Sequence, residues 1–259
     1  IFTPNNKELK RAVNLWCEDK TKAYKLFGHI SLWDTKQVTN MNGLFRFKSN
    51  FNSVISSWDV SNVLSMCLMF FCANSFDQKL NNWNVKNVKS MVGMFAYAIK
   101  FNQPLDNWNV SEVVMMTSMF ENSSFNQNIN NWDVSNVDCM YSMFENCENF
   151  NQPLNNWNVA EVESMDKMFK NCKKFNQPLD KWKININAQI LKMFFNCIEF
   201  NQVLNHWILD KKKICIELMF RNSAMKEKNK PITKKKINIQ KENKKKEIVG
   251  DMNISSYLV

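Results

Sequence analysis

Tryptophan recurs along this chain at an almost constant interval, and that interval limits the folds open to it. The eight regularly placed tryptophans are separated by 25 residues in six cases and by 24 in one: Trp33, Trp58, Trp83, Trp108, Trp132, Trp157, Trp182 and Trp207. Such self-similarity is typical of proteins built from stacked structural repeats. We therefore predict about eight tandem units of roughly 25 residues, each burying its apolar face against its neighbours.

Two further apolar columns keep the same register and suggest the structure of one unit. A phenylalanine precedes each tryptophan from Trp58 onward by seven residues, and almost every unit contains a Met-Phe pair such as Met69-Phe70. Trp58 and Val60 have the spacing of one strand face, whereas Val63, Met66 and Met69 step at a helical period. The sequence thus predicts an α/β repeat with one short parallel strand and one short helix in each unit of about 25 residues. Serines just before these segments are predicted to cap the helices: Ser61, Ser111 and Ser135.

The ends of the chain depart from the repeat. Residues 1–30 are predicted to form an N-terminal helical cap, because Thr3-Pro4 is a helix start, Leu9 and Trp16 share a helical face and Gly28 marks a stop. Residues 31–223 hold the repeats. We expect residues 224–259 to form a disordered tail whose removal leaves the repeats folded.

Most of the net charge of +10 lies in that tail. Between Lys226 and Glu247 there are ten lysines and three glutamates, which gives +7 and leaves only +3 for the rest of the chain. Clustered lysines can neutralise phosphates, so a weak contact with nucleic acid or an anionic lipid surface is one hypothesis for the tail. The alternative is a solvated segment with no ligand.

From about Trp33 to Phe220, the recurring motif SNV..M..MF..C..FNQ.LNNW.V resembles the BspA-like leucine-rich-repeat surface proteins, including mycoplasma-type members of unknown function. The resemblance implies a solenoid of short parallel strands used for surface display, adhesion or protein binding. It also implies a location at the cell surface or outside the cell, and it carries over no catalytic residues.

The residues that could support chemistry favour no enzyme, no cofactor and no metal site. His29 and His206 are the only histidines, and the four glycines make no phosphate-binding loop. Cys147, Cys172 and Cys197 all follow a Met-Phe pair by three residues, in a slot that elsewhere holds alanine or serine. We predict a buried column of reduced thiols there, because parallel side chains do not turn their Cβ atoms toward each other as a disulfide requires.

A polar column alternates with the buried positions next to each tryptophan. It consists of Asp34, Asp59, Asn84, Asn109, Asp133, Asn158 and Lys183. One hypothesis is that these side chains hydrogen-bond to one another from unit to unit. The other is a ligand-binding face, formed by Asp59, Asn84, Asn109, Asp133 and Asn158 and helped by neighbouring asparagines such as Asn82 and Asn107.

These patterns predict a noncatalytic module that binds a protein or a surface glycan and takes no small-molecule substrate. The alternative is an intracellular scaffold whose basic tail contacts nucleic acid or an anionic membrane. No apolar stretch approaches the roughly 20 residues needed to span a bilayer, and Ile1–Lys10 lacks a signal-peptide core. Because the chain begins with Ile1, we expect it to be a processed product, a fragment or an incomplete gene model.

Overall fold

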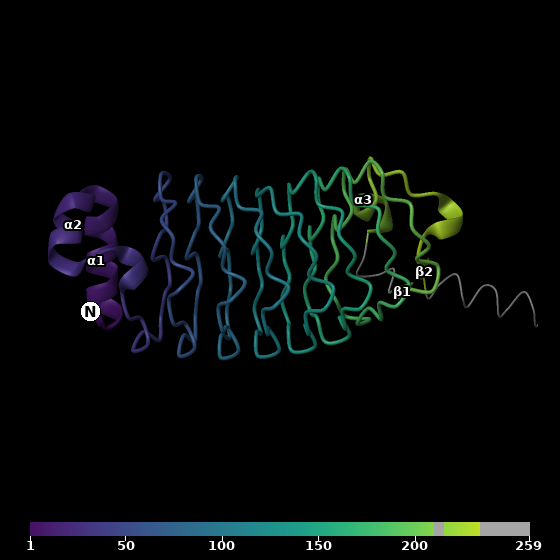
Figure 1. The fold of residues 1–259 in the computed structure, drawn as a ribbon. Coiled ribbons are helices and arrows are strands. Elements are labelled where there is room, and N and C mark those ends of the chain that lie inside the picture. Colours follow the sequence, from purple (N-terminus) through teal and green to yellow (C-terminus); the bar gives the residue numbers. More distant parts are fainter. Residues whose placement is uncertain (210–214, 234–259) are drawn as a thin grey trace, which may run out of the picture.

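The computed structural model describes residues 1–209 and 215–233. Helices α1 (Asn6–Glu18) and α2 (Lys20–Phe27) and the 3-10 helix η1 (Ile30–Leu32) come first in the chain. As Figure 1 shows, α1 and α2 lie at one end of an elongated molecule, and a series of similar coils follows them side by side. The last described elements, at the opposite end, are β1 (Ile208–Leu209), α3 (Ile216–Met219), η2 (Glu227–Asn229) and β2 (Ile232–Thr233).

Single parallel β-bridges join each coil to the next. They connect one residue per coil, in the order Asn40, Ser65, Ser90, Met115, Cys139, Ser164 and Gln189. The only step of 24 residues, from Met115 to Cys139, falls in the same unit as the short step from Trp108 to Trp132. The repeat read from the sequence is therefore the repeat of the coils.

The repeat units within residues 33–206 do not contain the predicted strand and helix. In the coil that starts at Trp58, residues 58–60 have no strand assignment, and the bridge lies at Ser65. The stretch expected to be helical is a run of overlapping turns, in which Met69 N–H donates to Met66 and Phe71 N–H to Leu68. Leu68 and Cys72 have positive φ angles of 56° each, which an α-helix does not allow.

Bonds between coils explain why turns replace the helix. The N–H groups of Met66, Leu68, Phe70 and Cys72 donate to carbonyls of the following coil, at N···O distances between 2.7 and 3.0 Å. A helix would direct these groups along its own axis and leave the neighbouring coil unpaired. The step of three between apolar positions is kept, because each turn also advances the chain by about three residues.

Aromatic rings fill the interior as continuous columns. All eight repeat tryptophans are buried, with 1 to 3% of their surface exposed, which confirms the prediction that each unit buries its apolar face against its neighbours. Phe70 stacks on Phe95 of the next coil at 5.4 Å between ring centroids and on Phe76 of its own coil at 4.0 Å. Stacking identical rings coil after coil buries a large apolar area with few side-chain degrees of freedom.

The N-terminal helices close the first coil. Asn5 caps α1 in a capping box with Glu8, and the face predicted from Leu9 and Trp16 is buried. Phe2, Trp16 and Phe27 pack around the ring of Trp33 at centroid distances of 5.4 to 6.1 Å. The helices thus cover the apolar end of the tryptophan column.

At the other end, the predicted boundary between repeats and tail, after residue 223, is wrong. Residues 224–233, assigned to the tail by composition, lie against the last coil: Ile232 N–H donates to Trp207, Leu204 N–H donates to Asn229, and β2 pairs in parallel with β1. Asn229 is 9% exposed. The apolar end of a stack needs a cover, and this short segment supplies it. Residues 234–259, which hold seven of the ten lysines between Lys226 and Glu247, lie outside the described residues.

Candidate functional site

The predicted polar column lies on the surface of the stacked coils. All seven members of the column are exposed: Asp34, Asp59, Asn84, Asn109, Asp133, Asn158 and Lys183. The first six lie between two buried positions, whereas Lys183 lies between buried Trp182 and half-buried Ile184. The tryptophan rings beside the column, such as Trp108 and Trp132, lie 6.4 Å apart between centroids in neighbouring coils. The column is therefore a row of polar groups at nearly constant intervals.

The side chains of the six Asp and Asn members of this column bond within their own coil, and the hypothesis of bonds from unit to unit is wrong for them. The Asp59 carboxylate accepts the N–H of Ser61 at 2.9 Å, and the Asn109 carbonyl oxygen accepts the N–H of Ser111 at 3.1 Å. Asn84 and Asn158 make the same contact at longer distances. These are Asx turns, in which the side chain takes the place of a backbone acceptor. The serines, predicted as helix caps, are donors in these turns.

Hydrogen bonding also stabilises the anionic form of the two acidic members. The hydroxyl of Ser61, followed by its backbone N–H, stabilises the Asp59 carboxylate and holds its pKa below the ordinary value. Ser135 lowers the pKa of Asp133 in the same way. Both groups are therefore anionic across the neutral range.

The asparagines of the column keep a donor for a ligand. Each Oδ1 is bound to the local backbone, and the amide nitrogens of Asn84, Asn109 and Asn158 have no acceptor among the described residues. Asn84 and Asn109 also line a shallow depression of about 340 Å³, together with Asn81, Asn82 and Asn107. Asn84 and Asn109 thus present oriented N–H donors beside a hollow in the surface.

A second polar row, which the sequence interpretation did not single out, does bond from coil to coil. It is formed by the second residue of the recurring Phe-Asn-Gln triplet: Asn52, Asp77, Asn102, Asn126, Asn151, Asn176 and Asn201. We name it the rung row. The side-chain oxygen of each rung accepts the backbone N–H of the next, at 2.8 to 3.0 Å. The constant position of Phe-Asn-Gln in each unit could have revealed this row, but the sequence interpretation used that triplet only as part of the family motif.

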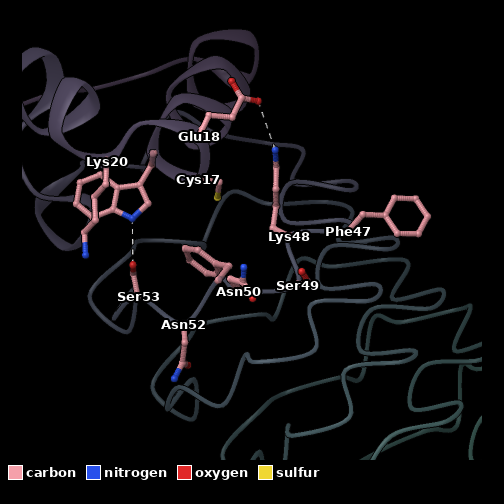
Figure 2. A pocket seen from close by; sticks show the side chains of 11 residues that line it. Cys17, Glu18, Lys20, Phe47, Lys48, Ser49, Asn50, Asn52 and Ser53 are labelled. Carbon is pink, nitrogen blue, oxygen red and sulfur yellow. Dashed lines mark hydrogen bonds and ion pairs between the residues drawn. The ribbon is translucent and has the colours of Figure 1, made fainter.

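Where α1 and α2 meet the first coil, a pocket of about 450 Å³ opens. We name it the junction pocket; it is lined by Trp16, Cys17, Glu18 and Lys20 from the helices and by residues 47–53 from the coil. In Figure 2, Lys48 extends toward Glu18, with 3.8 Å between charged atoms, and Ser53 accepts the Trp16 indole N–H at 3.0 Å. Nothing in the sequence marked this pocket, because it forms between segments far apart in the chain.

The cysteine column is placed as predicted. Cys147, Cys172 and Cys197 are buried in consecutive coils, and each thiol donates to a backbone carbonyl of the preceding coil at 2.8 to 3.0 Å. Burial raises the pKa of Cys147 to about 12 and raises those of the other two thiols as well. These thiols are protonated and poorly nucleophilic at neutral pH.

The described part of the chain contains no group of three or more His, Cys, Asp or Glu residues that could hold a metal ion. His29 bonds to the nearby Ser31, and His206 lies edge-on to Trp207. No helix within residues 1–209 and 215–233 is both long and apolar enough to cross a bilayer.

Comparison with known proteins relates the chain to one family. No curated protein and no solved structure matches it. Two segments, residues 17–125 and 119–235, match the family described as Mycoplasma protein of unknown function, DUF285. Together these segments include all eight regularly spaced tryptophans and end just past β2. The chain therefore belongs to this mycoplasma repeat family.

Proposed function

We propose that this protein is a noncatalytic binding module of the leucine-rich-repeat-like solenoid class, and that its ligand is a protein or a surface glycan. The binding face is the polar column of Asp59, Asn84, Asn109, Asp133 and Asn158. Display at the cell surface, as in the BspA-like proteins, is part of this proposal.

The amide nitrogens of Asn84, Asn109 and Asn158, which have no acceptor in the described part of the chain, are the observation that supports the proposal most directly. Their carbonyl oxygens are held in Asx turns, which fixes the direction of the remaining N–H donors before any ligand arrives. Donors ordered in advance lose little conformational entropy on binding. Asn84 and Asn109 lie in adjacent coils, whereas the carboxylate of Asp133 separates Asn109 from Asn158. The neighbouring pair of donors suits a ligand with two acceptors repeated at the spacing of adjacent coils, such as a polysaccharide or an extended polypeptide.

A binding screen with matched variants tests this function. We expect the intact chain to bind members of an array of extracellular glycans or surface proteins, and Asn84→Ala/Asn109→Ala to bind the same members at least about tenfold more weakly, since two ligand hydrogen bonds are lost. Asn128→Ala is the control, because Asn128 forms the same Asx turn, with Asn130 N–H, outside the column.

Unchanged ligand binding by the Asn84→Ala/Asn109→Ala variant would show that the polar column is not the binding face. If the only binding is to nucleic acid or anionic vesicles, falls steeply with salt and disappears when residues 234–259 are removed, the scaffold alternative is correct instead.

A further inference from the structure

The first member of the rung row lacks the partner that every later member has. From Asp77 to Asn201, each rung N–H donates to the side-chain oxygen of the rung 24 or 25 residues earlier. The residue 25 positions before Asn52 is Phe27, at the end of α2, which has no side-chain oxygen. The Asn52 N–H finds no acceptor in the described part of the chain, and Asn52 is the only exposed rung.

The opposite end of the row is completed by the chain itself. The Asn201 oxygen accepts the N–H of Lys226 at 2.9 Å and the amide nitrogen of Asn229 at 3.1 Å. Both groups belong to the segment that covers the last coil. The Lys226 N–H takes the place of the N–H of a next rung, and the Asn229 amide takes the place of the glutamine side chain that follows each rung from Asp77 onward. The open position is therefore at the N-terminal end.

The place where an acceptor for the Asn52 N–H would lie is in the junction pocket. Asn52 is one of its lining residues, and Figure 2 shows the Asn52 side chain pointing away from the helices, toward the later coils. By equivalence with the later rungs, its N–H faces the opposite way, toward the preceding layer. There the pocket occupies the space that a preceding Phe-Asn-Gln loop would fill.

The chemistry of the site follows from the rungs themselves. Asparagine oxygens accept five of the six rung N–H bonds, and the carboxylate of Asp77 accepts the sixth, from Asn102, at 3.0 Å. A carboxamide and a carboxylate therefore both fit. Lys20 and Lys48 line the pocket against the single carboxylate of Glu18, which tolerates a negative charge.

We propose that the junction pocket binds an extended peptide segment through an Asn or Asp side chain whose oxygen accepts the Asn52 N–H. The peptide supplies the missing first rung, and its backbone lies along residues 48–53. This site is separate from the polar column of the proposed function, so either can fail without the other.

Nuclear magnetic resonance of the ¹⁵N-labelled full chain tests the proposal at the N–H in question. On titration with acetyl-Asn-Gln-amide, we expect the Asn52 amide proton to move downfield with saturation and its hydrogen exchange to slow. The amides of Asp77 and Asn102, already bonded, should not move. Acetyl-Asp-Gln-amide should act on the same amide, whereas acetyl-Ala-Gln-amide should bind about fivefold more weakly, because it lacks the acceptor.

A blocking variant gives an independent control. Ser49 is an exposed lining residue, and Ser124 is the exposed residue at the equivalent position three coils later. We expect Ser49→Trp to abolish the shift of the Asn52 amide and Ser124→Trp to leave it unchanged. No saturable shift in the unsubstituted chain, or an equal shift with the alanine peptide, would overturn the proposal without use of either variant.

Discussion

Six of the eight repeat tryptophans pack their rings and also tie two coils together. The indole N–H of Trp58, Trp83, Trp108, Trp132, Trp157 and Trp182 donates to a backbone carbonyl 27 or 28 residues earlier, at 2.8 to 3.2 Å. Trp33 donates instead to Gly28, only five residues earlier, at 3.3 Å. The buried indole nitrogen of Trp207 has no partner among the described residues. A phenylalanine could fill much of the same space but could not make this bond.

Replacing Trp108 and Trp207 separates the bond from the packing. Both rings are 2 to 3% exposed, but only Trp108 donates, to Leu80 at 2.9 Å. We expect Trp108→Phe to lower the free energy of unfolding by about 1 kcal/mol more than Trp207→Phe, the usual net value of one hydrogen bond. Urea unfolding followed by circular dichroism measures both. An equal or larger loss in Trp207→Phe would mean that packing alone explains the tryptophan column.

The buried thiol of Cys147 makes stability depend on pH in the alkaline range. Burial raises its pKa in the folded chain from 9.0 to about 12, so the unfolded chain loses this proton first as pH rises. The contribution of the thiol is fully present below pH 9 and is lost between pH 9 and 12, at about 1.4 kcal/mol per pH unit.

Alanine at the same position provides the comparison, since Ala73 and Ala98 fill this slot in earlier coils. We expect Cys147→Ala to be less stable than the unsubstituted chain at pH 7, by about 1 kcal/mol for the lost packing. The difference should shrink and then reverse as the pH passes 9 in thermal unfolding experiments. Parallel curves for the two proteins up to pH 10.5 would show that the thiol titrates normally.

Each coil depends on backbone conformations that most residues avoid. Two positions per coil, four residues apart, have positive φ, as in Ser118 and Asn122 at 54° and 55°. Gly43 and Gly93 occupy the first of these positions in two other coils, whereas several coils place a larger residue there. Asparagine, which tolerates this region better than most residues, fills the second position from Asn122 onward.

Ser118→Gly tests the cost of that conformation. The φ of Ser118 lies in the left-handed region, and its hydroxyl has no partner in the described part of the chain. We expect the substitution to raise the free energy of unfolding by about 0.5 to 1 kcal/mol, because glycine removes the clash of Cβ with the backbone. Ser164→Gly, at a bridge residue without positive φ, should lower it by a similar amount. Chemical unfolding curves compare the two, and a loss of stability in Ser118→Gly would contradict the argument.

The stack as a whole is finite, so both of its ends need covers. Helices α1 and α2 cover the first coil, and residues 224–233 cover the last with β2, η2 and the bonds to Asn201. This arrangement changes the expected effect of shortening the chain. Removing all of residues 224–259, expected from composition to leave the repeats folded, would also remove the cover.

Two truncations distinguish the cover from the rest of the tail. A chain ending at residue 233 keeps the bond from Leu204 N–H to Asn229 and should protect that amide from hydrogen exchange as the full chain does. A chain ending at residue 223 should expose it and raise its exchange rate at least about tenfold, because local opening then needs no displacement of the cover. The Trp108 amide, in a central coil, serves as the reference. Equal protection of Leu204 in both truncations would show that residues 224–233 are not a cover.

Much of the architecture could be read from residue spacing alone. The period, the unit with 24 residues, the burial of the tryptophan and phenylalanine columns and the helices before the repeats all follow from which positions are apolar. A side chain that recurs at one offset in every unit must occupy the same environment in each coil, and large apolar side chains lose free energy when exposed. The surface position of Asp59, Asn84 and Asn109 follows from the same alternation.

The local backbone and the polar contacts required the folded structure. A step of three apolar positions is shared by a helix and by successive turns, and only the pairing of Leu68 and Cys72 with the next coil decides between them. In the sequence, the polar column and the rung row look the same. The first bonds within its own coil and the second between coils, because each side chain binds the backbone N–H groups that the folded coils leave free near it. The junction pocket and the cover of the last coil depend on contacts between distant segments, and residue spacing carries no information about such contacts.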